Sequence, residues 1–132
     1  MTRLVVAVVF DLGGVVFDSP LVAMRAFEAE LGLAAGALGR LVVGGGDDGA
    51  WARYERGEID AAAFHRAFEA EGAAAGIVFS AEEMMERING AARPRPLMLR
   101  AIGKLRSSGF KVAALTNNRS GMGHTAEVEE RF

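Results

Sequence analysis

The sequence lacks cysteine, which excludes disulfide bonds and thiol chemistry and is typical of a cytoplasmic protein. It also lacks an excess of either charge. The formal net charge of -2 argues against a nucleic-acid-binding surface or a polybasic membrane surface. The longest apolar run, residues 4–10, is far too short to cross a bilayer, and no small-residue cleavage site follows it. We therefore expect a cytoplasmic protein that binds neither nucleic acid nor a membrane.

Proline is scarce, and the three prolines divide the chain. Ser19 and Pro20 offer an N-cap followed by proline at the first position of a helix. Pro94 and Pro96 stiffen a connection that leads into a predicted helix over residues 97–107. Residues 20–92 carry apolar side chains at helical spacing and contain no strand pattern of comparable quality, so we expect this block to be helical.

Two continuous apolar runs, residues 4–10 and 110–115, are typical of strands that are buried on both faces. The order is therefore strand, helical block, helix and strand. Helices that connect strands in this way favour a parallel sheet and an α/β fold. We predict a core made of residues 1–19 and 93–132, with residues 20–92 inserted after the first strand as an all-helical domain.

Local signals within the block predict where its helices begin and which faces they bury. Asp60 is placed to cap a helix, and Ser80 with Glu83 forms a capping box. The glycine-rich residues 44–49 lack the acid spacing of an EF-hand and the lysine of a P-loop, so we expect a solvated loop. The side chains expected in the core are Leu21, Met24, Phe27, Leu31, Trp51, Tyr54, Phe64, Phe68, Met84 and Ile88, with Met98, Ile102 and Leu105 beyond Pro96.

Polar residues follow both predicted strands at the points where the strands end. Asp11 comes directly after the first strand, and Thr116, Asn117 and Asn118 follow the second. Ligands of open parallel sheets bind at the carboxyl ends of the strands, so these residues are candidates for a functional site. Spacing alone leaves a second interpretation open, in which Asp11 only caps the turn that follows it.

Residues 10–16 (Phe-Asp-Leu-Gly-Gly-Val-Val) resemble motif I of the haloacid dehalogenase superfamily, and residues 114–118 (Ala-Leu-Thr-Asn-Asn) resemble its motif II. The helical block stands where that superfamily carries a small cap domain. Residues 44–51 and 55–59 resemble the cap of one subgroup. This subgroup includes the N-terminal domains of acyl-CoA dehydrogenase family member 10 and of soluble epoxide hydrolase, together with bacterial sugar-phosphate phosphatases. The resemblance implies a Rossmann-like core with a helical cap that closes over the site.

The resemblance also implies a mechanism, in which Asp11 attacks the phosphorus atom of a small phosphorylated metabolite and forms an aspartyl-phosphate. A carboxylate that attacks an anionic phosphate needs a cation between them, which implies Mg²⁺. Asp11 and the backbone carbonyl of Gly13 would be metal ligands. Thr116 would donate its hydroxyl to the phosphoryl oxygens, and Asn117 or Asn118 would hold the substrate or the loop.

Three departures from the superfamily pattern limit the activity that we expect. Gly13 stands where phosphatases of the family usually carry a second aspartate that acts as general acid and base. Both lysines, Lys104 and Lys111, precede motif II, so neither matches the motif III lysine. The acidic pair of motif IV is absent. We therefore expect a chain truncated at its C-terminus, which is a poor enzyme and self-associates through its incomplete core.

Other interpretations remain open at this point. A haloacid-dehalogenase-type hydrolase would suit the non-acidic Gly13, and a non-catalytic fragment or binding module would suit the missing motifs. His65 and His124 are far apart in the sequence, and no carboxylate cluster lies at ligand spacing from them, so we expect neither to bind a metal.

Overall fold

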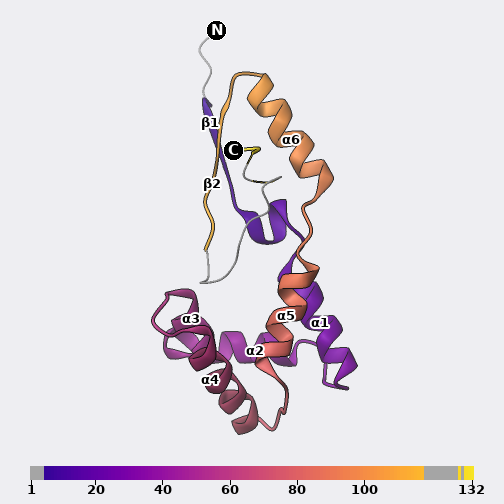
Figure 1. The fold of residues 1–132 in the computed structure, drawn as a ribbon, viewed down its shortest axis with the longest axis vertical. Coiled ribbons are helices and arrows are strands. Elements are labelled where there is room, and N and C mark those ends of the chain that lie inside the picture. Colours follow the sequence, from indigo (N-terminus) through magenta and orange to yellow (C-terminus); the bar gives the residue numbers. More distant parts are fainter. Residues whose placement is uncertain (1–4, 118–127, 129) are drawn as a thin grey trace. The chain divides into compact units, whose positions relative to one another are not determined.

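A computed structural model describes residues 5–117, 128 and 130–132 and shows an α/β fold (Figure 1). The described residues form two compact units, which we call the core unit (residues 5–19, 92–117, 128 and 130–132) and the helical unit (residues 20–91). The elements in chain order are β1 (Ala7–Phe10), the wide turn η1 (Leu12–Val16), α1 (Pro20–Glu30), α2 (Ala37–Gly44), the short turn η2 (Gly46–Asp48), α3 (Ala50–Glu55), α4 (Ala61–Ala74), α5 (Ala81–Ala91), α6 (Pro96–Ser107) and β2 (Lys111–Ala114).

The two strands of the core unit are neighbours and parallel, as the sequence predicted. Their register pairs Ala7 with Lys111 and Phe10 with Ala114. The N–H of Leu115 donates to the carbonyl of Phe10 at 2.9 Å and extends the pairing by one hydrogen bond. The carboxyl ends of both strands therefore lie at the same edge of the sheet.

The expectation that both faces of these strands are buried is wrong for the described residues. One face packs against α6, which runs beside the two strands in Figure 1. On the other face Val9 is 60% exposed, and beyond the end of β2 Leu115 is 74% exposed. Continuous apolar runs are typical of sheets with helices on both faces, and here the described residues cover only one. Leu4, the first residue of the predicted first strand, lies outside the described residues.

The core of the core unit forms where η1 meets α6. Pro96 occupies the first turn of α6, where its missing N–H leaves no hydrogen bond unmade. Ile102 is fully buried, as predicted. Met98 and Leu105 are only half-buried, and Leu99 is the second buried side chain of α6. The cluster consists of the buried side chains of Leu12, Val16, Leu99, Ile102 and Val128, with Phe10, Val15, Phe17, Val112 and Phe132 packed against them.

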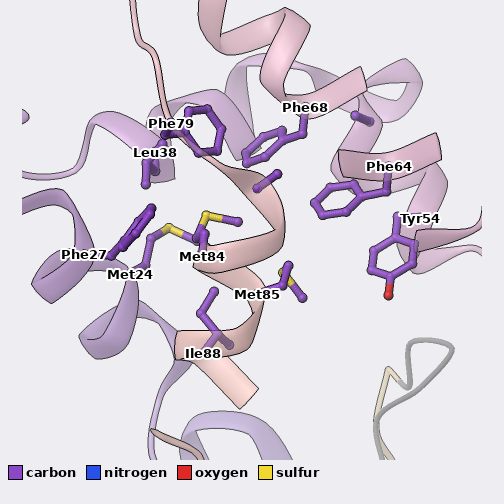
Figure 2. Close-up of a cluster of buried hydrophobic side chains, with 12 residues drawn as sticks. Met24, Phe27, Leu38, Tyr54, Phe64, Phe68, Phe79, Met84, Met85 and Ile88 are labelled. Atoms are coloured by element: carbon purple, nitrogen blue, oxygen red, sulfur yellow. The ribbon is translucent and has the colours of Figure 1, made fainter. Parts of the chain in front are cut away.

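Residues 20–91 contain helices and turns and no strand, as the sequence predicted. Their core is a single apolar cluster whose largest side chains are shown in Figure 2. Phe64 lies between Tyr54 and Phe68 and stacks on both, with ring centroids 4.5 Å and 5.3 Å apart. Aromatic stacks of this kind stabilise a core beyond the area they bury. The predicted inward faces of α4 and α5 are confirmed, since Phe64, Phe68, Met84 and Ile88 are all buried.

Helix α1 differs from the prediction in which side chains it buries. Met24 and Phe27 are buried as expected, whereas Leu21 is 54% exposed and Leu31, just beyond the end of the helix, is 42% exposed. The third buried side chain on this face of α1 is instead that of Glu28, which is only 1% exposed. A buried carboxylate needs hydrogen-bond donors, and backbone N–H groups at the start of α2 supply them.

Three glutamates cap helices that are distant from them in sequence. The two oxygens of Glu28 accept the N–H groups of Gly36 (2.6 Å) and Leu38 (2.7 Å) at the start of α2. Glu71 accepts the N–H of Ala50 at the start of α3, and Glu69 accepts that of Ala81 at the start of α5, both at 2.8 Å. The residues at the N-caps of α2 and α3 are Gly36 and Gly49, which have no side chain with which to cap. The glutamates therefore supply the carboxylates that these helix starts lack.

The caps predicted from local sequence are also present. Asp60 accepts the N–H of Ala63 at 2.7 Å, and the Ser80 hydroxyl accepts the N–H of Glu83 at 3.2 Å. Gly45 and Gly49 pack so closely that a Cβ added to Gly49 would lie 2.7 Å from the Cα of Gly45. Packing therefore requires glycine at positions 45 and 49 of this loop.

The two segments of the helical unit that resemble the subgroup's cap are joined by Arg56. Its guanidinium donates to the carbonyl of Asp47 at 2.7 Å and to the carboxylate of Glu58 at 2.6 Å. The hydrogen bond from Arg56 lowers the pKa of the exposed Glu58 carboxyl. Whether the helical unit acts as a cap stays a prediction. No helix among the described residues is long and apolar enough to cross a membrane.

Candidate functional site

Asp11 lies directly after the last paired residue of β1, with its side chain exposed. Its backbone is extended, and its Oδ1 accepts the N–H of Leu12 at 2.7 Å. The turn-capping role that the sequence left open is therefore present. A carboxylate has two oxygens and about four acceptor positions, so this one bond leaves most of its capacity for other partners. Capping fixes the orientation of Asp11 and is compatible with a chemical role.

Two glycines give the turn after Asp11 its shape. The dihedral angles of Gly13 (φ -66°, ψ 120°) and Gly14 (φ 76°, ψ -2°) are those of a type II β-turn. Gly14 needs to be glycine because its φ is positive. Gly13 does not, because its φ is negative and a Cβ added to it would meet nothing within 4 Å. The space beside Asp11 is therefore open, and packing does not explain the absence of an acid at Gly13.

Thr116 and Asn117 follow β2 at the same edge of the sheet as Asp11. Thr116 is half-buried and Asn117 is exposed. The regular pairing ends at Phe10 and Ala114, so the sheet does not fix the directions in which the side chains of Asp11 and Thr116 point. Their convergence on one phosphate stays a prediction. Asn118 lies outside the described residues.

Within the core unit, neither of the two lysines considered from the sequence lies at the end of β1 that leads into Asp11. Lys111 pairs with Ala7, three residue positions from Phe10, and a strand advances about 3.3 Å per residue, so it lies roughly 10 Å from the Asp11 end. Lys104 is in the last turn of α6. His65 is on α4 with its ring 5.7 Å from that of Phe64, and His124 lies outside the described residues. Among described residues, neither lysine takes the place of the motif III lysine.

The oxygens of Asp11 and of the Gly13 carbonyl are hard donors, which suit Mg²⁺. Both residues are exposed, and no side chain at Gly13 obstructs an approaching ion. In the part of the chain that the structure describes, no group of three or more histidine, aspartate or glutamate side chains could hold a metal. The described residues therefore offer a chemically suitable but partial set of ligands.

Arg95 lies near the site and was not predicted from the sequence to belong to it. Its backbone N–H donates to the carbonyl of Val16 at 2.7 Å, and its Nη1 donates to the carbonyl of Gly14 at 3.3 Å. Both acceptors belong to the turn that follows Asp11. The sequence signal for Arg95 is its place between Pro94 and Pro96, a pattern that by itself predicts only a stiff connection.

Comparisons with known proteins identify the family of the chain. The family profile of the haloacid dehalogenase-like hydrolases matches residues 5–128. Acyl-CoA dehydrogenase family member 10 of Mus musculus is 31% identical over 115 residues, which are 85% of this chain and 11% of that protein. The chain thus spans about a tenth of the length of this relative. The profile match covers both strands, the turn after Asp11 and the whole helical unit, and the chain therefore belongs to the haloacid dehalogenase-like hydrolases.

Proposed function

We propose that the protein is a phosphatase-type hydrolase in which Asp11 attacks the phosphorus atom of a small phosphorylated metabolite. The observation that carries this proposal is the exposed Asp11 carboxylate at the carboxyl edge of a parallel sheet, held by the N–H of Leu12 at 2.7 Å. The attack forms a bond between an Asp11 oxygen and phosphorus and breaks the bond to the leaving group. Water then hydrolyses the aspartyl-phosphate and regenerates the carboxylate.

The neighbouring residues have supporting roles in this proposal. The Thr116 hydroxyl donates to a phosphoryl oxygen, and Asn117 holds the substrate or its own loop. Asp11 and the carbonyl of Gly13 would hold Mg²⁺, which would offset the repulsion between the carboxylate and the phosphate. The cytoplasmic location expected from the cysteine-free sequence is part of the same proposal.

Gly13 has a chemical consequence for the substrate. It cannot donate a proton to the departing oxygen, and a positioned acid is commonly worth a factor of about 10²–10⁴ in rate. Substrates whose leaving group departs as a stable anion, such as aryl or acyl phosphates, should therefore be hydrolysed faster than alkyl phosphates. An aryl phosphate is for this reason the appropriate first substrate.

The test compares the variant Asp11→Asn with the unaltered protein. Both are expressed as the full product of the natural reading frame and are assayed on an aryl phosphate with Mg²⁺. We expect Asp11→Asn to abolish turnover, because the amide cannot form the covalent intermediate. Glu86→Gln, which removes an exposed carboxylate on α5 outside both cap-like segments, is the matched control and should keep full activity. A hydroxylamine-sensitive phosphopeptide containing Asp11 would identify the intermediate. Hydrolysis that persists in Asp11→Asn would overturn the assignment of Asp11 as the nucleophile.

One observation favours a second candidate, a hydrolase of the dehalogenase type. Nucleophilic attack on carbon with halide as the leaving group needs no proton donor, which suits Gly13. The same variants should then be assayed for halide release from a 2-haloacid without Mg²⁺. Halide release that depends on Asp11, with no phosphate release, would favour this candidate. Failure of both reactions would favour a non-catalytic binding module.

A further inference from the structure

Two segments far apart in the sequence are joined beside the turn that follows Asp11. Phe17 and Pro94 form an antiparallel bridge. The N–H of Asp18 donates to the carbonyl of Arg93 at 3.0 Å, and the N–H of Arg95 donates to that of Val16 at 2.7 Å. The end of the turn is therefore tied by backbone hydrogen bonds to the segment that leads into α6.

The side chain of Arg95 extends this connection to the middle of the turn. Its Nη1 donates to the carbonyl of Gly14 at 3.3 Å, and its Nε lies 3.8 Å from an oxygen of Asp18. A guanidinium is a rigid plane with five N–H donors, so one side chain can hold two acceptors in a fixed relation. Arg95 thus spans the turn from Gly14 to Asp18.

The contacts of Arg95 should affect the geometry of the turn more than the free energy of unfolding of the protein. The side chains of Arg95 and Asp18 are both about half exposed (51% and 53%), and exposed ion pairs contribute little to folding. The turn, in contrast, is unusually free, because its central peptide joins Gly13 to Gly14. Types I and II of a β-turn differ by a rotation of that peptide, and two glycines present little steric barrier to it.

We propose that Arg95 is a positioning residue, which holds the carbonyl of Gly14 and so keeps the turn after Asp11 in one conformation. The dihedral angles ψ of Gly13 and φ of Gly14 set the direction of the Gly13 carbonyl, the oxygen assigned above to Mg²⁺. The N–H of Phe17 closes the turn on the carbonyl of Leu12 at 2.9 Å. Loss of the Arg95 contact should therefore loosen this closing bond while the backbone bonds to Arg93 and Val16 persist.

The first measurement does not depend on activity. Amide hydrogen exchange, followed residue by residue by NMR, is compared in the unaltered protein, Arg95→Ala, Arg95→Lys and the control Arg100→Ala, an exposed arginine on α6. We expect the Phe17 amide to exchange roughly three- to tenfold faster in Arg95→Ala, the factor that corresponds to one hydrogen bond. The amide of Ile102 in α6 should not change. Arg95→Lys should restore part of the protection, since an ammonium can reach one acceptor but does not reproduce the planar fork.

The second measurement rests on the proposed function and asks what the positioning does for turnover. On an aryl phosphate, Arg95→Ala should lower kcat by about the same factor as it raises the exchange rate of the Phe17 amide. KM should change little. A raised KM at constant kcat would mean that Arg95 binds substrate directly and would overturn the positioning role. If the unaltered protein hydrolyses no phosphate, the proposed function fails but the exchange result still decides the inference. Unchanged exchange at Phe17 in Arg95→Ala would overturn it whatever the activity.

Discussion

The buried Glu28 offers the sharpest test of how the helical unit is stabilised. Its carboxylate accepts two backbone N–H groups, from Gly36 at 2.6 Å and from Leu38 at 2.7 Å. The variant Glu28→Ala removes both acceptors and leaves two N–H groups without their partner. Each buried unsatisfied group costs about 1–3 kcal/mol. With a further contribution from the lost side-chain volume, we expect Glu28→Ala to lower the free energy of unfolding by about 3–5 kcal/mol.

The assay is equilibrium unfolding in urea, followed by circular dichroism and by the fluorescence of Trp51, the single tryptophan, which packs against the same core. Glu28→Gln should cost about half as much, since its amide oxygen can accept one N–H while its NH₂ group faces the other. Glu86→Ala, at an exposed position on α5, is the control and should change stability by less than about 0.5 kcal/mol. If Glu28→Ala costs no more than Glu86→Ala, the capping role is refuted.

Three further predictions follow from the turn and the sheet. Gly13→Asp should leave stability nearly unchanged, because a Cβ there meets nothing within 4 Å, and should raise hydrolysis of alkyl phosphates relative to aryl phosphates; a destabilised variant would contradict the open space. Gly14→Ala should lower the free energy of unfolding by about 1–2 kcal/mol because of its φ of 76°, whereas Gly13→Ala should not, as measured by urea unfolding. The chain should self-associate through its exposed sheet face, so Val9→Lys together with Leu115→Lys should lower the apparent mass in sedimentation; an unchanged mass would exclude this surface.

Regular periodicity and local caps were the features that the sequence predicted well. The α/β fold, the parallel pairing of the two apolar runs and the start of α1 at Pro20 are confirmed. So are the caps by Asp60 and by the Ser80 hydroxyl. Each of these depends on residues close together in the chain or on a run long enough to fix its period. The superfamily motifs also predicted the family correctly.

Individual side-chain contacts between residues that are distant in the sequence were missed. The sequence pattern predicts that Glu28 is a polar, exposed position of a helix, and nothing nearby in the sequence shows that it is buried. Its role arises only when α1 meets the start of α2. Arg95 likewise contacts Gly14 across 81 positions of the chain. The exposure of Leu21 and Leu31 has a related cause, because spacing gives a helix an apolar stripe without stating which part of it meets a neighbour.

For the candidate site, the topology of the two strands gives the edge of the sheet, whereas the predicted convergence of the side chains stays a prediction. Asp11, Thr116 and Asn117 follow the ends of neighbouring parallel strands, which is a consequence of topology. The directions of their side chains depend on the turns beyond the paired residues. Turn geometry of this kind is set by glycine dihedral angles and by contacts such as that of Arg95, which no local pattern encodes.

The capping of α2, α3 and α5 by glutamates from other helices has a consequence for how the helical unit folds. Helices α2 and α3 are only eight and six residues long, too short to be stable alone in water, and they begin after glycines. Their caps come from Glu28 on α1 and Glu71 on α4, which are in place only after those helices have docked. We therefore expect a peptide of residues 36–56 to be unstructured in isolation, and the unit to lose its helices together rather than one at a time. Changes in loop length should be tolerated only where they leave each glutamate within reach of the helix start that it caps.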